Sequence, residues 1–451
     1  HGNQGTTNSV YIDDFVYDTI SACPDPIALV TNKVEYNAAA ISFSSAGPVT
    51  DYIYEYGMGG FTLGSGTQVT GGTNPDTITG LTGNTTYDVY VKSNCGSDSS
   101  EWVGPLTFLT PCSPSTILSG TYTIDKNQPT SSTNFNSFTE AEQRLNDCGV
   151  SGPVVFNIQP GTYTDNLQIY NVLGVSSANT ITFNGSGVDT LVYDGQDEQA
   201  TVLISGTKYV TLRNMHIINN DNTEAFGVLI TANSDSVTID SCYVKVGNGS
   251  TSTASDALPI LISDSYTNDI DEDAEVDYLT ISNSFITGGA YGISLEGDGT
   301  DDFSLGHRVI NNEIYDFYVS GVVCDDIQDI IVADNKIESS KGPADGIYLG
   351  DINDYQITGN TINVGDYGIY VSDGNDGYVP SQRSAVINNM VISTTDYGIY
   401  LTNFEYTDVF HNTAMGEPAM AINDQVSVDI RNNIFTSLGD HAFYSLDPLA
   451  T

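Results

Sequence analysis

A short pattern that recurs over the C-terminal part of the chain constrains the fold more than any other feature. It alternates a strand-like motif of the form G-I-x-L with a bend motif of the form I-x-N-x-I. The glycines of the first motif are Gly292, Gly321, Gly346, Gly368 and Gly398. The asparagines of the second are Asn214, Asn283, Asn312, Asn335, Asn360, Asn389, Asn412 and Asn432. From Asn283 onward they lie 20 to 29 residues apart, a period that indicates a solenoid.

The repeats are predicted to consist of strands, because apolar residues alternate at i, i+2 and never follow the i, i+3, i+4, i+7 spacing of a helix. Three short strands per coil, each paired with its counterpart about 4.8 Å away in the next coil, describe a parallel β-helix. Right-handed winding is expected for parallel crossovers. Asparagine suits the bend because it tolerates left-handed backbone geometry and its amide can hydrogen-bond to the next coil.

On these two motifs, residues 118–446 resemble the pectate-lyase-type parallel β-helix repeat family. That family contains polysaccharide lyases, hydrolases, epimerases, phage tailspikes and non-catalytic surface proteins, so the resemblance implies a fold rather than an activity. A cap is expected at about 118–160, because an open solenoid end exposes strand edges and core. Within it, Ser137 and Glu140 form a capping-box pattern that predicts a short helix.

Residues 23–112 show short alternating strands separated by Gly, Pro and Asn turns, the pattern of a small antiparallel β-sandwich. The run from Ile78 to Lys92 resembles a fibronectin type III domain, which implies a tyrosine corner at Tyr87 with its hydroxyl bonded to upstream backbone. Phe43 departs from the core tryptophan of that family. The resemblance implies a spacer or a weak binder.

Residues 1–22 contain one predicted strand, which cannot form a domain alone. The fragment Tyr11-Ile12-Asp13-Asp14-Phe15 resembles the closing strand of jelly-roll modules in secreted bacterial proteins. We interpret these residues as the tail of a preceding module or a linker, so that the chain would be a piece of a longer protein; a simple edge strand is the alternative. The β-helix is assigned to residues 113–451, with no C-terminal cap recognisable after the last strand.

The charge balance restricts the partners. With 57 acidic and 12 basic residues, the net charge of −45 disfavours nucleic acid and anionic membranes and favours cations. No apolar run is long enough to insert into a membrane. A Thr-, Ser-, Asn- and Gly-rich chain of this kind suits a bacterial protein that is secreted or held at the cell surface. The six cysteines permit several pairings, and Cys324 is expected to be a small buried hydrophobe.

Acidic residues follow the G-I-x-L strands at one position, so that Asp326, Asp351 and Asp373 are expected to stack on adjacent coils. Three interpretations compete. The bend can simply favour Asp, Asn and Gly; the column can bind Ca²⁺, together with an acidic insertion at Asp269, Asp271 and Asp273; or the carboxylates can form the acid/base pair of a glycosidase, since β-helix hydrolases place paired aspartates on adjacent coils.

Tyrosines occupy the outward position of three successive G-I-x-L strands, at Tyr348, Tyr370 and Tyr400. Such a column stabilises a sheet by a few tenths to about 1 kcal/mol per pair, which is one sufficient explanation. It also offers a sugar-binding or adhesive face, because each ring is apolar with a polar tip.

The sequence therefore predicts an all-β protein: a small antiparallel β-sandwich followed by a right-handed parallel β-helix solenoid with a short N-terminal capping helix. The expected function is that of a non-catalytic extracellular stalk, an adhesin or carbohydrate-binding module stabilised by Ca²⁺. Its partners would be a polysaccharide or cell-surface glycan, and other surface-protein chains or domains of the same protein. The alternative is a polysaccharide-degrading β-helix enzyme acting through Asp326, Asp351 or Asp373. Against it, the motif order of pectin hydrolases is absent, with Gly306-His307-Arg308 preceding Asp325-Asp326.

Overall fold

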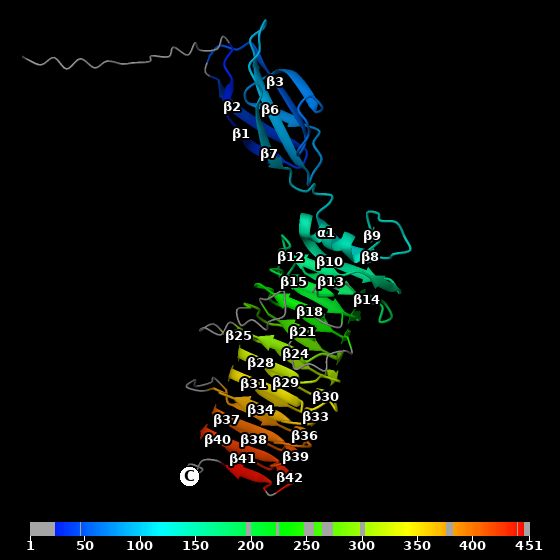
Figure 1. The fold of residues 1–451 in the computed structure, drawn as a ribbon, viewed down its shortest axis with the longest axis vertical. Helices are drawn as coiled ribbons and strands as arrows, with labels where there is room; N and C mark the ends of the chain where they lie inside the picture. The colour runs from blue at the N-terminus through cyan, green and yellow to red at the C-terminus, as the bar shows by residue number, and fades with distance from the viewer. Residues whose placement is uncertain are drawn as a thin grey trace, which may run out of the picture. The chain divides into compact units, whose positions relative to one another are not determined.

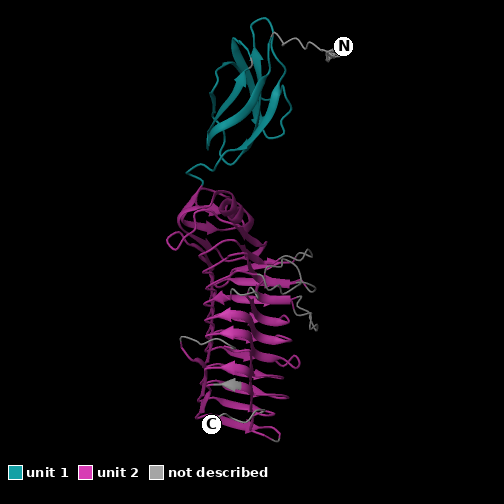
Figure 2. Cartoon of the chain, turned by 90° about the vertical axis from the view of Figure 1, so that its left-hand side faces the viewer, with its two compact units in different colours: residues 1–116 teal, residues 117–451 magenta. Residues whose placement is uncertain are grey.

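The computed structural model describes residues 23–45, 47–194, 200–221, 225–247, 257–263, 274–297, 303–375, 382–439 and 441–445. The chain forms two compact units, residues 1–116 and 117–451 (Figures 1 and 2). The strand expected within residues 1–22 and the acidic insertion at Asp269, Asp271 and Asp273 lie outside the described residues. Among the described residues, no helix is long and apolar enough to span a membrane.

The first unit is an antiparallel sandwich of two sheets. One sheet has the order β1-β2-β5, with β1 (Pro26–Glu35), β2 (Ala38–Ser45) and β5 (Asp76–Thr79). The other has the order β4-β3-β6-β7, with β3 (Asp51–Met58), β4 (Thr67–Gly72), β6 (Thr86–Asn94) and β7 (Val103–Leu109). Alternate residues of the strands face inward, and Ile41, Tyr54 and Val89 are buried between the sheets.

The tyrosine corner forms as expected, since the Thr82 backbone N–H donates to the Tyr87 hydroxyl at 3.0 Å. Phe43 fills the core, 7% exposed, and meets Tyr52 edge-on at 4.5 Å between ring centroids. Cys23 is disulfide-bonded to Cys95, a pairing that the sequence left open. Disulfides persist in oxidising compartments, so this bond confirms the predicted export from the cytoplasm.

The second unit is a parallel β-helix whose coils each contribute one strand to three long sheets (Figure 1). The 13-stranded sheet contains β8 (Leu118–Ile124), β9 (Asn134–Phe135), β10 (Val150–Ile158), β13 (Ile181–Asn184), β16 (Val210–Arg213), β19 (Thr238–Asp240), β22 (Thr280–Ser282), β26 (Arg308–Ile310), β29 (Ile331–Ala333), β32 (Gln356–Thr358), β35 (Ser384–Ile387), β38 (Thr407–Phe410) and β41 (Asp429–Arg431). The 11-stranded sheet contains β11 (Thr162–Thr164), β14 (Thr190–Tyr193), β17 (His216–Asn219), β20 (Tyr243–Val246), β23 (Phe285–Thr287), β27 (Glu313–Tyr315), β30 (Lys336–Glu338), β33 (Thr361–Val364), β36 (Met390–Ser393), β39 (Thr413–Gly416) and β42 (Ile434–Ser437).

The 12-stranded sheet is formed largely by the G-I-x-L motifs and carries the residues discussed below. It contains β12 (Leu167–Tyr170), β15 (Val202–Ser205), β18 (Ala225–Thr231), β21 (Ala257–Ile262), β24 (Tyr291–Glu296), β25 (Ser304–Leu305), β28 (Ser320–Gln328), β31 (Asp345–Asn353), β34 (Ile369–Ser372), β37 (Ile399–Glu405), β40 (Met420–Val426) and β43 (Phe443–Ser445). Strand β25 lies off the main path and pairs with β28.

Coil-to-coil register brings equivalent residues together. Ile347 pairs with Ile369, and Ile369 pairs with Ile399, in parallel ladders. All three side chains are fully buried and belong to one continuous apolar core. The inward half of the i, i+2 alternation therefore fills the solenoid, and the outward half is left on its surface.

Helix α1 (Phe138–Cys148) covers the core at the N-terminal end of the solenoid, as the capping box predicted. The Ser137 side chain accepts a hydrogen bond from the Glu140 N–H at 3.1 Å, and Glu140 Oε2 accepts one from the Asn136 N–H at 2.9 Å. Phe138 and Leu145 are completely buried under the helix. These contacts satisfy backbone donors of the first turn while shielding the first coils from water.

A buried asparagine ladder runs along the bend between the 13- and 11-stranded sheets. In each step the side-chain oxygen of one asparagine accepts from the backbone N–H and the side-chain amide of the previous one. Asn335, for example, donates both groups to Asn360 Oδ1 at 3.0 Å, and its Nδ2 also donates to the Val309 carbonyl at 2.8 Å. The ladder consists of Asn312, Asn335, Asn360, Asn389, Asn412 and Asn433.

The ladder corrects the predicted asparagine column in two respects. Its members are not the left-handed residues of the bend; that geometry belongs to the residue before each, such as Asn388 with φ 59°. Accordingly Asn214, Asn283 and Asn432, all with positive φ, occupy the bend position rather than the ladder, and Asn433 takes the ladder position. Both positions favour asparagine, one for its backbone tolerance and the other for its paired donor and acceptor.

Candidate functional site

Three predicted tyrosines lie in register on the outer face of the 12-stranded sheet. Tyr348 on β31 pairs with Tyr370 on β34, which pairs with Tyr400 on β37. The ring centroids of Tyr348 and Tyr370 are 5.1 Å apart, and those of Tyr370 and Tyr400 are also 5.1 Å apart. Each side chain is half-buried rather than fully exposed, because its neighbours cover one side of the ring.

Two further tyrosines, which the sequence analysis missed, join this column from the turns before β34 and β37. Tyr367 stacks on Tyr370 at 5.1 Å, and Tyr397 stacks on Tyr400 at 4.8 Å. The rings of Tyr367 and Tyr397 are nearly parallel, 5.5 Å apart with an interplanar angle of 8°. The repeated sequence Asp-Tyr-Gly-Ile-Tyr was the available signal. We call these five residues the tyrosine platform: Tyr348, Tyr367, Tyr370, Tyr397 and Tyr400.

The predicted aspartate column exists, and its backbone geometry explains much of it. Asp326, Asp351 and Asp373 have φ of 52°, 42° and 56°, in the left-handed region that Asp and Asn tolerate. Asn403, one coil further, has φ 47°. The bend preference is therefore a sufficient reason for Asp or Asn at each of these positions.

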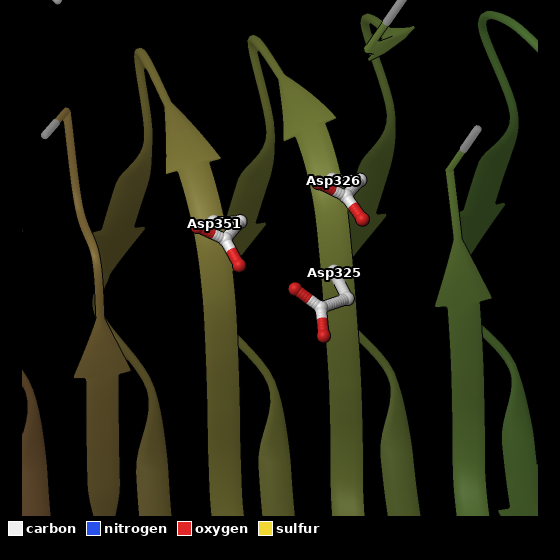
Figure 3. Close-up of side chains that lie close together, drawn as sticks. All are labelled: Asp325, Asp326 and Asp351. Carbon is white, nitrogen blue, oxygen red and sulfur yellow. The ribbon is translucent and has the colours of Figure 1, made fainter. Parts of the chain in front are cut away.

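The side chains do not form the uniform column that was expected. Carboxylate oxygens of Asp325, Asp326 and Asp351 lie within 4.8 Å of one another on β28 and β31, as Figure 3 shows. Asp373 is not in this cluster; its Oδ1 accepts from the Asn403 side chain at 2.8 Å and its Oδ2 from the Ser372 hydroxyl at 2.6 Å. We call Asp325, Asp326 and Asp351 the aspartate cluster. It adds Asp325, which was absent from the predicted metal site, and removes Asp373 from it.

A glycine connects this cluster to the tyrosine platform. Gly350 pairs with Asp325 across β28 and β31. A Cβ atom on Gly350 would lie 2.7 Å from Asp325 Oδ1 and 3.0 Å from the Tyr348 hydroxyl. Any side chain would collide with both groups, so glycine here lets a carboxylate and a phenol approach each other.

Glu296 extends the carboxylates by one coil in the opposite direction. It pairs with Asp325 across β24 and β28, it is 7% exposed, and its Oε1 accepts from the Ser294 hydroxyl at 3.2 Å. Between these acids, the buried thiol of Cys324 has its pKa raised well above the ordinary value by desolvation, with Glu296 and Asp325 adding to the effect. Cys324 is thus the inert buried hydrophobe that was expected.

A second acidic group flanks the platform at the start of the strands. Desolvation raises the pKa of Asp345 to about 7, assisted by the nearby charges of Asp366 and Asp396 and opposed by its hydrogen bond from the Tyr367 N–H. Burial also raises the pKa of Asp366 and of Asp396. We call Asp345, Asp366 and Asp396 the upstream acidic row. The sequence analysis did not single it out.

The chemistry of the aspartate cluster is that of a hard cation site. Carboxylate oxygens suit Ca²⁺, Mg²⁺ or Mn²⁺, and three close carboxylates repel one another unless a cation or protons neutralise them. The same set, with Glu296 beside it, also provides the paired acids that general acid/base chemistry needs. Asp269, Asp271 and Asp273, assigned to the same metal by the sequence analysis, lie outside the described residues.

A comparison with known proteins finds one family model that matches part of the chain. Residues 231–381 match a family model described as NosD, a periplasmic copper-binding protein. No curated protein matches the chain. Among solved structures, the chain is similar to a mutant of a periplasmic alginate epimerase, with 17% identity over 64% of this chain and 66% of that one and a TM-score of 0.46.

Two other solved structures are also similar to parts of the chain. The family 28 exopolygalacturonase of Yersinia enterocolitica is 9% identical over 90% of this chain and 98% of that one, with a TM-score of 0.32. The fibronectin type III domain of the human collagen α-1(XX) chain is 23% identical over 22% of this chain and 94% of that one, with a TM-score of 0.19. At such identities the likeness concerns the fold alone.

The copper in the matched family's description does not fit the residues of the matched segment. Copper in proteins takes imidazole, thiolate or thioether ligands. Residues 231–381 contain one histidine, two cysteines and no methionine. His307 is fully buried, its Nδ1 accepts from the Leu279 N–H at 3.1 Å, and desolvation lowers its pKa to about 3. Cys242 and Cys324 are buried, and burial raises the pKa of Cys242 to about 12. The aspartate cluster is all oxygen, so we assign it no copper chemistry.

Proposed function

We propose that this chain is an exported, non-catalytic glycan-binding protein whose β-helix presents the tyrosine platform to a polysaccharide or cell-surface glycan. The observation that carries this proposal is the platform itself: five half-buried rings on one face, four of them stacked and Tyr348 edge-on to Tyr370, with hydroxyl groups beside carboxylates. A sugar ring presents an apolar face and a rim of hydroxyls, and stacked tyrosines with neighbouring acceptors complement both.

Bound Ca²⁺ is the second part of the proposal. The aspartate cluster would hold it, at the edge of the platform where the Tyr348 hydroxyl approaches Asp325. A cation there offsets the mutual repulsion of three carboxylates and leaves coordination positions for water or for sugar hydroxyls. The proposed partners also include other surface-protein chains and further domains of the same protein. No residues are assigned to contacts with them.

The test is a glycan array followed by titration calorimetry on each hit, with and without Ca²⁺. Replacing Tyr348, Tyr370 and Tyr400 together by Ala should abolish binding while the far-UV circular dichroism and the melting cooperativity are kept. The matched control is the aromatic stack of Tyr243, Phe285 and Tyr315 on the 11-stranded sheet, with ring centroids 5.4 and 5.2 Å apart. Its triple Ala variant should bind glycan as the wild type does; equal loss in both variants would contradict the proposal.

A polysaccharide-degrading enzyme is the second candidate, and the buried Glu296 opposite Asp325 favours it. One carboxyl with a raised pKa and one ionised partner form the acid/base pair of glycosidases. If the chain cleaves a glycan, Asp325→Asn, Asp326→Asn or Asp351→Asn should each lower turnover by about three orders of magnitude. Reproducible cleavage by the wild type, lost in one of these variants, would replace the binding proposal by the enzymatic one.

A further inference from the structure

The tyrosine platform lies between two acidic groups, one at each end of its strands. On the downstream side, a Cβ atom on Gly350 would lie 2.7 Å from Asp325 Oδ1 and 3.0 Å from the Tyr348 hydroxyl, so this carboxylate lies close to the phenol. Desolvation raises the pKa of Tyr348 to about 12, and the charges of Asp325, Asp351 and Asp373 add to this effect. On the upstream side, Asp345 accepts a hydrogen bond from the Tyr367 N–H at 3.0 Å, and Asp366 and Asp396 directly precede Tyr367 and Tyr397 in the sequence. Desolvation raises the pKa of Tyr370, in the middle, and the charges of Asp373 on one side and Asp345 on the other add to this effect. Any ligand on the rings therefore meets carboxylates at both edges.

Basic residues that could offset these charges are almost absent from this part of the sequence. Between residues 341 and 430 the chain has two, Arg383 and the exposed Lys341 in the turn before β31. The Arg383 guanidinium binds other groups. Its Nε pairs with Asp408 Oδ1 at 2.5 Å, and its Nη2 donates to the Thr407 and Ser427 carbonyls at 3.1 and 2.6 Å. Those partners lie on or beside the 13-stranded sheet. Strands β31, β34 and β37, which carry the platform, contribute no cation of their own.

Building on the proposed function, we infer that the tyrosine platform selects uncharged glycans and rejects polymers of uronic acids. Stacking on a tyrosine ring needs only an apolar sugar face and is indifferent to charge. When no cation occupies the aspartate cluster, however, a uronate brings one carboxylate per residue into a field of the same sign, and carboxylates along both edges leave no orientation that avoids it. Like-charge juxtaposition is an effective way to exclude a wrong ligand.

The experiment compares neutral oligosaccharides with oligogalacturonates of equal length, by calorimetry on the whole chain in a chelating buffer. At low ionic strength the uronates should bind at least about tenfold more weakly, and raising the salt to about 1 M should narrow the gap because repulsion between exposed charges is screened. Uronates that bind as tightly as neutral glycans through the tyrosines would overturn this inference and leave the proposed function intact. Absence of any tyrosine-dependent glycan binding would overturn both.

A double variant tests the contribution of the upstream acidic row to this selectivity. Asp366→Asn combined with Asp396→Asn removes two charges from the upstream acidic row and should move the ratio of uronate to neutral dissociation constants several-fold toward one. The control is Glu313→Gln combined with Asp334→Asn, which removes two exposed charges, one on β27 of the 11-stranded sheet and one at the bend before β30 of that sheet. It should leave both affinities unchanged; an equal effect of the two double variants would mean that net charge, and not the platform's edges, sets the selectivity.

Discussion

The asparagine ladder and the aspartate column run along the same coils of the β-helix. Both stack like side chains, but the hydrogen bonds that these side chains can form differ. The asparagine ladder is largely buried, and each of its inner members donates to one neighbour and accepts from the other. The aspartate column follows the ends of the 12-stranded sheet's strands, where a carboxylate can only accept. The ladder therefore supplies its own donors and acceptors, whereas a row of carboxylates must take its hydrogen bonds from other groups, from water or from a cation.

Within the aspartate column the same contrast appears again. Asp373 has found an amide partner, Asn403, and is absent from the aspartate cluster. Asp351 occupies the position on the next coil that is equivalent to Asp326. The carboxylates of both residues belong to the aspartate cluster. The residue at the equivalent position of the next coil therefore makes the difference: Asn403 hydrogen-bonds to Asp373, whereas Asp351 forms the candidate cation site with Asp326.

The largest effect is expected from breaking the ladder. Asn360→Ala removes the acceptor of the Asn335 backbone and side-chain amides and the donor to the Val332 carbonyl and to Asn389 Oδ1. Four buried groups each lose one hydrogen bond, although Asn389 Oδ1 keeps the Asn360 N–H and Asn335 Nδ2 keeps the Val309 carbonyl. At about 1 kcal/mol for each bond, the free energy of unfolding should fall by roughly 4 kcal/mol. Urea unfolding measures it. Asp351→Asn, which keeps a residue suited to left-handed φ, should change it by less than about 0.5 kcal/mol; similar losses would mean that the two columns do not differ as argued.

A second comparison contrasts the inside and the outside of one strand. Ile369 is fully buried and its neighbour Tyr370 is half-buried on the outer face. Ile369→Ala should lower the free energy of unfolding by roughly 2 to 5 kcal/mol through the cavity it leaves. Tyr370→Ala should lower it clearly less, because it removes three ring contacts at a surface that water can reach. Equal destabilisation by the two changes would show that Tyr370 belongs to the core.

Calcium should distinguish the aspartate cluster from the rest of its column. If the cluster binds Ca²⁺, saturating ion should stabilise the wild type by about 1 to 3 kcal/mol through mass action, and chelation should lower the melting temperature accordingly. Asp351→Asn should abolish this response. Asp373→Asn, which changes the same column outside the cluster, should retain it. A wild type whose melting is unaffected by chelation at low ionic strength would reject structural calcium.

The smallest effect concerns pH and the upstream acidic row. Desolvation raises the pKa of Asp345 to about 7 from 3.8, so between these values the folded chain binds more protons than the unfolded chain. Stability from this group is therefore complete below about pH 4 and is lost as the pH rises through about 7. The melting temperature should be higher at pH 5.5 than at pH 8 by a few degrees at most, since the group is partly solvated. Asp345→Asn should flatten this slope; an unchanged slope would assign it to other groups.

The sequence by itself determined the fold, because the repeat period and the i, i+2 alternation are properties of the backbone. A coil of 20 to 29 residues with three short strands has one way to bury Ile347, Ile369 and Ile399 together. The tyrosine column was equally accessible, since residues at one phase of identical motifs must stack. The bend preference for Asp and Asn followed from local backbone geometry alone.

The tertiary structure decided which of these residues meet. Asp325 joins Asp326 and Asp351 because Gly350 on the next strand leaves room for its carboxylate. Asp373 is not part of the aspartate cluster, and it accepts a hydrogen bond from the side-chain amide of Asn403 on the following coil. Tyr367, Tyr397, Asp366 and Asp396 lie in turns, where the strand phase no longer fixes direction, and Asp345 is the first residue of β31. Strand periodicity specifies the face on which a side chain lies, but contacts between side chains depend on the particular residue that each neighbouring coil places beside it.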